Sequence, residues 1–205
     1  SRAGAQRNPQ IKETEREERR HATARAARIR RILILAGVAV VTAGGIVFAA
    51  TRPEPAALAA IETYPDQGAQ HIDPTGPAFG YNSNPPTSGS HAPQPAPCGI
   101  YRQEVPDVVV VHNLEHGAIV VRYDPALAAG EREALEAFAR DAGTHILVSP
   151  HSGLDDPIVL TGWTKMLRLT TADRTAIDAF YGQFAQNGPE RGVPCPNQVD
   201  EGTSG

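Results

Sequence analysis

The sequence lacks the usual markers of catalysis. It contains no GxSxG motif, no phosphate-binding loop and no cysteine and histidine pair at a catalytic spacing. These absences remove the common signals of a serine hydrolase, a nucleotide-binding enzyme and a cysteine protease. The 205 residues include only one tryptophan, one methionine and two cysteines, and they show no internal repeat. A non-catalytic role is therefore favoured, and a hydrolase is a weak alternative.

Positive charge is scarce in most of the chain. Residues 1–31 contain ten Lys or Arg and four Glu, a net charge of +6, whereas residues 32–205 contain nine Lys or Arg and nineteen Asp or Glu, a net charge of −10. A basic head on an acidic body suggests two environments. The acidic body lacks the basic face of a nucleic-acid-binding domain, so we expect no nucleic-acid partner.

Charge is absent from residues 32–50, which read ILILAGVAVVTAGGIVFAA. A helix of these 19 residues spans roughly 28 Å, close to the hydrocarbon thickness of a bilayer. Four arginines directly precede the run: Arg25, Arg28, Arg30 and Arg31. Because such an excess marks the cytoplasmic side, the sequence predicts a transmembrane signal-anchor with a cytoplasmic N-terminus.

The predicted organisation has four parts. They are a basic cytoplasmic segment at 1–31, the transmembrane anchor at 32–50, a tether at 51–63 and an extracytoplasmic domain at 64–205. The expected location is the cell membrane, with the lipid bilayer as a partner through the anchor and an unknown protein partner left open. A cleaved signal peptide is the alternative, because Val47-Phe48-Ala49 is a tolerable cleavage sequence, although the apolar run is longer than usual for one.

Residues 64–106 are rich in turn-forming residues, with nine Pro and five Gly in 43 positions. Composition alone is typical of disorder. Aromatic and histidine side chains are nevertheless spread through the segment: Tyr64, His71, Phe79, Tyr81, His91 and Tyr101. We therefore expect an ordered, irregular segment wrapped over the core that follows.

The remaining sequence predicts an α+β domain. Runs of β-branched and apolar residues predict strands at 108–111, 118–123, 145–149 and 157–161, the last of which residues 163–169 could extend. Amphipathic patterns predict a helix at about 130–142, ended by Gly143, and a helix capped by Thr171. The order ββαββα implies a small mixed sheet of about four strands with two packed helices. The irregular segment and one N-terminal transmembrane helix would precede it.

The two cysteines, Cys98 and Cys195, both follow the predicted anchor. Export favours oxidation, and no CxxC spacing is present. The sequence therefore predicts a disulfide between Cys98 and Cys195. The rival interpretation is a pair of separated thiolate ligands.

The most distinctive local sequence is VVVVHNLEHGAIVV, in which His112 lies four residues before His116 and Glu115 lies between them. Residues four apart share a face in a helix and also in a strand, so both imidazoles could converge on a metal ion. His91, after a Pro-Pro turn, is expected as a third ligand, with Glu115 and His71 as further candidates. Imidazole suits several transition metals, so copper or zinc is the expected cofactor if the histidines bind a metal, and otherwise no cofactor is expected.

Two other interpretations of this motif are possible, and three further residues need mention. His112 and Asn113 could instead hold a tight connection between two strands by hydrogen bonds to the backbone. H-x-x-E-H is also the spacing of a metallopeptidase class in which the motif lies on a helix, but the valine runs predict strands on both sides, so that chemistry is disfavoured. A thioether from Met166 would favour copper. His145 and His151 are expected at the surface.

A family resemblance appears at these residues. The runs YNSNPPTSGSH at 81–91, GIY at 99–101 and VHNLEHG at 111–117 resemble a bacterial domain-of-unknown-function family, over about residues 60–197. Family members typically have one N-terminal membrane helix, and often Pro where this chain has Ser90. The resemblance implies a membrane-attached domain with an ordered 64–106 segment, and it implies no activity and no metal.

Two functions are consistent with the sequence. The first is an extracytoplasmic domain that binds a transition metal through its histidines. The second is a non-catalytic interaction module of a membrane or envelope complex, in which the histidines are structural. The distances among the side chains of His91, His112 and His116 would separate the two.

Overall fold

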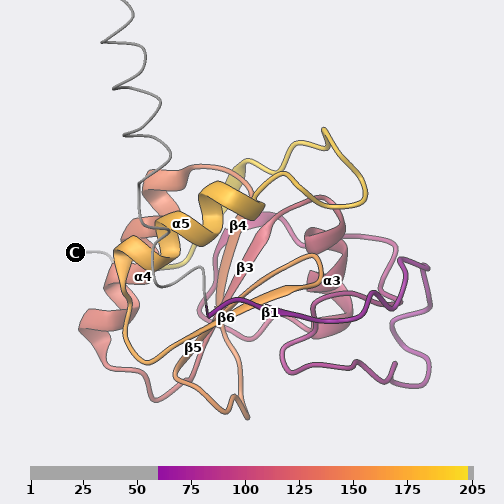
Figure 1. Ribbon diagram of the computed structural model, residues 1–205, viewed down its shortest axis with the longest axis horizontal. Coiled ribbons are helices and arrows are strands. Elements are labelled where there is room, and N and C mark those ends of the chain that lie inside the picture. The colour runs from indigo at the N-terminus through magenta and orange to yellow at the C-terminus, as the bar shows by residue number, and fades with distance from the viewer. Residues whose placement is uncertain (1–59, 203–205) are drawn as a thin grey trace, which may run out of the picture. The chain divides into compact units, whose positions relative to one another are not determined.

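The computed structural model describes residues 60–202 (Figure 1). The predicted cytoplasmic segment, the anchor at 32–50 and most of the tether lie outside the described residues. Within residues 60–202, no helix has both the length and the apolar character needed to cross a membrane.

A single mixed sheet of seven strands organises the described part of the chain, in the order β1-β6-β5-β3-β4-β2-β7. The strands are β1 (Glu62–Thr63), β2 (Cys98–Ile100), β3 (Ile119–Tyr123), β4 (Ile146–Pro150), β5 (Ile158–Gly162), β6 (Lys165–Leu169) and β7 (Asn197–Asp200). The half from β1 to β3 is antiparallel, whereas β3, β4, β2 and β7 run parallel to one another. The central strand β3 is buried along its whole length.

Helices cover both faces of this sheet (Figure 1). On one face, α4 (Ala129–Ala142) and α5 (Arg174–Phe184) pack apolar residues such as Phe138 and Phe180 against the odd-numbered positions of β3. On the other face, α3 (Asp107–Glu115) packs Val110 and Leu114 against Val120. Because α3 has its own apolar contact with the sheet, its polar residues are held at defined positions.

The α+β class and the mixed sheet are confirmed, but the domain has more elements than predicted. Three helices and seven strands occur within residues 60–202. Residues 163–169 do not extend β5: the chain turns at Trp163 and Thr164, and β6 returns antiparallel. The last helix is capped by Asp173, whose side chain accepts from the amides of Thr175 and Ala176, and not by Thr171.

The predicted strand at 108–111 is wrong, because these valines form the first turns of α3. The preference of valine for strands is weak, and tertiary contacts can override it. Pro106 precedes the helix, and the Asp107 carboxylate in the first turn suits the positive end of its dipole. Arg122, fully buried in β3, donates to Asp107 Oδ1 at 3.1 Å and to the carbonyl of Val105 at 2.6 Å. These bonds fix the start of α3 over the sheet.

The segment at 64–106 is irregular apart from β2, as predicted. It passes over the side of the molecule that carries α3 (Figure 1). Residues 85–92 are all buried, and the amide of Ala92 donates to the carbonyl of Val108 at 2.8 Å. This part of the segment therefore packs against α3.

The predicted disulfide is confirmed. Cys98 in β2 is bonded to Cys195, with a Cα–Cα distance of 5.6 Å. Both cysteines are buried, so neither is a free thiolate ligand. The bond joins the irregular segment to the C-terminal residues that lead into β7.

Candidate metal centre

His112 lies on the side of α3 that faces the 64–106 segment. Its side chain is 6 % exposed, and Nδ1 donates to the carbonyl of Ala92 at 2.8 Å. Burial lowers the pKa of the His112 imidazole below its usual value, against the opposing effect of that hydrogen bond. A lowered pKa keeps the ring neutral, which is the state that binds metal.

His91 enters the same space from the irregular segment. Its side chain is fully buried, and Nδ1 donates to the carbonyl of Gly89 at 2.8 Å. Gly89 has a φ of +125°, and a Cβ there would lie 2.7 Å from the ring of Phe79. The glycine of the PPTSGSH run is therefore required for the turn that presents His91.

His71 is placed by its backbone, twenty residues earlier in the chain. The amide of Ile72 donates to the carbonyl of His91 at 2.8 Å, and the amide of His91 donates to the carbonyl of Gln70 at 3.0 Å. The His71 ring stacks on His112, with centroids 4.9 Å apart and planes 16° apart. Its side chain is 49 % exposed, so it forms the solvent side of the cluster.

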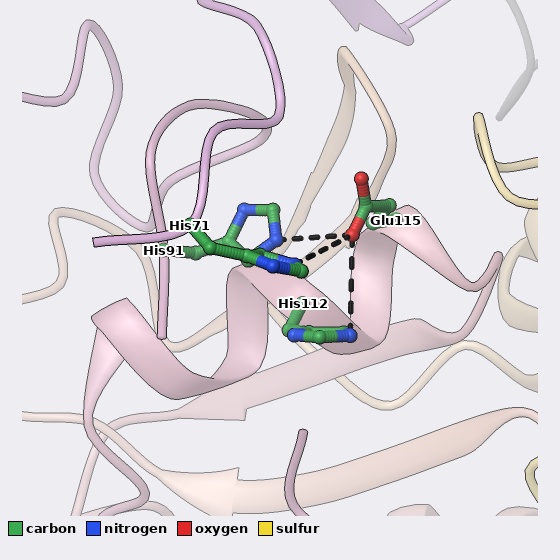
Figure 2. Close-up of side chains that lie close together, drawn as sticks. All are labelled: His71, His91, His112 and Glu115. Carbon is green, nitrogen blue, oxygen red and sulfur yellow. Dashed lines mark hydrogen bonds and ion pairs between the residues drawn. The ribbon is translucent and has the colours of Figure 1, made fainter. Parts of the chain in front are cut away.

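Glu115, one turn after His112, completes the group. Its Oε2 lies 3.0 Å from Nε2 of His91, 3.7 Å from Nε2 of His71 and 3.9 Å from Nε2 of His112 (Figure 2). The four ligand atoms all lie within 4.8 Å of one another. Ligands of a tetrahedral zinc ion are about 3.3–3.4 Å apart, from bond lengths of about 2.0–2.1 Å. The group could therefore hold a metal ion with small side-chain movements.

The hydrogen bonds decide which nitrogen of each buried ring faces inward. A carbonyl oxygen only accepts, so Nδ1 of His91 and of His112 must carry a proton. In the neutral ring Nε2 then presents a lone pair, and in His91 that lone pair faces a carboxylate oxygen at 3.0 Å. Such an arrangement is repulsive unless a proton or a cation lies between the two atoms. Metal-bound histidines are oriented by the same kind of carbonyl contact.

His116 touches this group but is not one of the four. Its Nε2 lies 3.0 Å from Nε2 of His112 and 3.1 Å from Oε2 of Glu190. Glu115, His116 and Glu190 form a second group whose ligand atoms lie within 4.8 Å of one another. Glu190 could not be predicted as a candidate ligand from the sequence, because no local pattern distinguishes it. Only the fold brings the loop after α5 to the end of α3.

The H-x-x-E-H motif lies on a helix, and the strands predicted on both sides of it are not both present, because residues 108–111 belong to α3. The position of Glu115 decides whether that metallopeptidase chemistry is possible. In that metallopeptidase class the glutamate activates a metal-bound water. Here the Glu115 carboxylate lies among three imidazole nitrogens at 3.0–3.9 Å, so it is placed as a candidate ligand and not as a base beside a bound water.

Other residues of the HNLEHG run hold the centre together. The Asn113 side chain donates to the carbonyl of Ala96 at 2.7 Å and accepts from its amide at 3.1 Å, which ties the segment after His91 to α3. Leu114 is fully buried against the sheet. Gly117 has a φ of +80°, the left-handed conformation that ends many helices. Both His112 and Asn113 therefore hydrogen-bond to the backbone, as the alternative interpretation predicts, but they do so from a helix and not from a connection between two strands.

Three residues lie elsewhere. His145 and His151 are both buried, so their predicted surface location is wrong. Nε2 of His145 lies 3.0 Å from the carbonyl of Val193, and Nε2 of His151 lies 3.3 Å from Asp107 Oδ2. Met166 is fully buried in β6. The two histidines have structural partners and belong to neither group of ligand atoms.

The fold and the site define a small α+β domain with a buried histidine and glutamate cluster between a helix and an irregular segment. The chain belongs to the family described as protein of unknown function DUF3105, whose model matches residues 71–197. The matched region begins at His71 and includes every residue of both ligand groups. No curated protein and no solved structure matches the chain.

Proposed function

We propose that this chain is a membrane-anchored, extracytoplasmic domain that binds a transition metal ion through His71, His91, His112 and Glu115. The observation that carries the proposal is the convergence of three Nε2 atoms and one carboxylate oxygen within 4.8 Å of one another. Two of the imidazoles are buried and held by backbone carbonyls, so this convergence is built into the fold.

The donor atoms favour a transition metal of intermediate softness. Three imidazoles and one carboxylate suit zinc, copper, iron or nickel, whereas magnesium and calcium prefer oxygen ligands. No cysteine sulfur is available, because both cysteines form the disulfide. Zinc and copper remain the first ions to test.

The location is proposed from the uncharged run at 32–50 and the arginines before it. The disulfide supports an oxidising compartment. Because His71 is half-exposed, an ion at this centre would lie near solvent and could be exchanged with a protein partner or a small chelator.

The proposal is tested by metal titration of the purified full chain in detergent, with zinc, copper and nickel in separate calorimetric experiments at neutral pH. We expect stoichiometric binding of at least one of these metals. Replacing His91 or His112 with alanine should abolish binding at this centre, since each removes a buried ligand. The matched control is His151→Gln, a substitution of a buried histidine outside the cluster, which should bind as the wild type does.

Failure of all three metals to bind the folded chain would remove the metal proposal. The interaction module would then take its place, with the three imidazoles and Glu115 acting as a buried hydrogen-bonded network that holds the 64–106 segment on α3. Loss of folding in His112→Ala together with absence of metal from the wild type would be the signature of that role.

A further inference from the structure

We infer that Glu115, His116 and Glu190 form a second divalent-cation position, which shares the Glu115 carboxylate with the first and makes the centre dinuclear. The inference deepens the proposed function and rests on it. It goes beyond that proposal in the number of ions, in the role of Glu115 as a bridging ligand and in the participation of Glu190.

The Glu115 carboxylate is placed to serve two ions. Its Oε2 takes all the contacts with His71, His91 and His112. Figure 2 shows its other oxygen directed away from the three imidazole rings. The side chain as a whole is 8 % exposed. Carboxylates that bind one cation through each oxygen are suited to two-metal sites, in which the ions are about 3.5–4 Å apart.

His116 supplies the nitrogen ligand of the second position. It follows Glu115 directly, at the end of α3, and its side chain is 11 % exposed. Its Nε2 faces two acceptors, Nε2 of His112 at 3.0 Å and Oε2 of Glu190 at 3.1 Å. A single N–H cannot point directly at both. A cation bound to Nε2 of His116 and to Glu190 removes this conflict.

Glu190 is held near His116 by backbone hydrogen bonds between the loop after α5 and the end of α3. Its amide donates to the carbonyl of Glu115 at 3.0 Å, and the amide of Gln186 donates to the carbonyl of Gly117 at 2.7 Å. A Cβ on Gly188 would overlap the carbonyl oxygen of Glu115, so only glycine allows this approach. The loop after α5 is therefore fixed against the end of α3, and Glu190 does not reach His116 by chance movement of a free loop.

The two positions differ in chemistry and in access. The first has three imidazoles and one carboxylate, whereas the second has one imidazole and two carboxylates. Oxygen-rich sets accept manganese as well as zinc. The Glu190 side chain is 56 % exposed, and His116 also lines a groove of about 260 Å³ between residues 94–98 and 193–198. The second ion would thus also be open to solvent, on the side of Glu190 and this groove.

The test compares the wild-type full chain with Glu190→Gln, which keeps the shape of the side chain and removes its charge. Each protein is titrated with zinc by calorimetry and with manganese by electron paramagnetic resonance. We expect the wild type to bind about two zinc ions and the variant about one, since Glu190 is no ligand of the first position. The saturated wild type should give the broad signal of coupled manganese ions, and the variant an isolated-ion signal. Glu133→Gln removes an exposed charge on α4 and should behave as the wild type does.

The outcomes separate the two proposals. One zinc ion bound by both proteins, with no manganese coupling, overturns the second position and leaves the first intact. Two ions bound by Glu190→Gln also overturns it, because the second ion would then not depend on Glu190. No binding by the wild type removes the proposed function itself. Circular dichroism on Glu190→Gln checks that the exposed substitution leaves the fold unchanged.

Discussion

Backbone carbonyls act on the candidate centre through single hydrogen bonds. Gly89 and Ala92 each accept from a histidine Nδ1, at 2.8 Å in both cases. Each bond fixes a tautomer and turns Nε2 towards Glu115. Removing a hydrogen bond to the other ring nitrogen of a metal-bound histidine commonly lowers metal affinity by about 10–100-fold. The turn that contains Gly89 therefore contributes to the metal affinity of the centre through the orientation of His91.

A pH effect follows from the buried His112 ring. Its pKa is lowered in the folded chain, chiefly by burial, whereas in the unfolded chain it is about 6.5. As the pH falls below about 6.5, the unfolded chain therefore binds the proton first, and the free energy of unfolding decreases until the folded pKa is passed. Above that range both forms are neutral and this group contributes no pH dependence.

The measurement is urea unfolding with a chelator present, at pH 7.5 and pH 5.5. His112→Asn removes the titrating group and keeps a donor near the Ala92 carbonyl. The wild type should lose more stability than this variant between the two pH values. Equal losses in the two proteins would show that His112 makes no such contribution. In the presence of metal the wild-type affinity should weaken over the same range, because protons compete for the imidazoles.

Among the elements, α3 and the loop after α5 pack with their backbones in close contact. A Cβ on Gly117, which has a positive φ, would lie 2.8 Å from the backbone of Gln186 and Asn187. A Cβ on Gly188 would overlap the backbone of Glu115 and Gly117. The two glycines face each other across one interface. This interface brings Glu190 to His116, so it decides whether the second ligand group forms.

Gly188→Ala should therefore destabilise the domain by about 1–3 kcal/mol, the usual cost of overpacking. Gly182→Ala is the matched control, since Gly182 lies inside α5 and a Cβ there meets no atom within 4 Å. That change should instead stabilise by about 0.5–1 kcal/mol, because alanine favours the helix. Thermal unfolding of both variants checks the two signs, and a neutral Gly188→Ala would contradict the close approach.

For the whole domain, the disulfide is the main covalent restraint. It joins residues 97 positions apart, and a loop of that length corresponds to about 4–5 kcal/mol in the chain-entropy model. We expect Cys98→Ala with Cys195→Ala to lower the free energy of unfolding by about 2–5 kcal/mol. Urea unfolding with and without reductant provides the measurement. Reductant should destabilise the wild type and leave the double variant unchanged; the same midpoint for oxidised wild type and double variant would refute the expectation.

The anchor is the prediction that concerns the whole chain. A reporter that is active only outside the cytoplasm, fused to the C-terminus, should be active, because the uncharged run at 32–50 follows four arginines on the expected cytoplasmic side. The protein should fractionate with membranes and resist extraction by carbonate. Recovery of a soluble secreted form that starts near residue 50 would show instead that the run is a cleaved signal peptide.

Several features could be predicted from the sequence, because they depend on local patterns. The amphipathic spacing of α4 and α5 and the apolar runs of β3, β4 and β5 mark elements that bury one face or both. The disulfide followed from an even cysteine number and predicted export. The sequence also names His91, His112, Glu115 and His71 as candidate ligands, but it places His116 in the same set, whereas His116 belongs to a second group in the structure.

The tertiary structure alone decided three things. Residues 108–111 form a helix because Val110 and Leu114 bury against the sheet, a contact that outweighs the strand preference of valine. The short strands β1, β2 and β7 have too few residues to show a period. Glu190 meets His116 only because two glycine positions let distant backbones touch. Local sequence sets which side chains are available, and long-range packing sets which of them converge, since convergence depends on contacts between segments that no local pattern records.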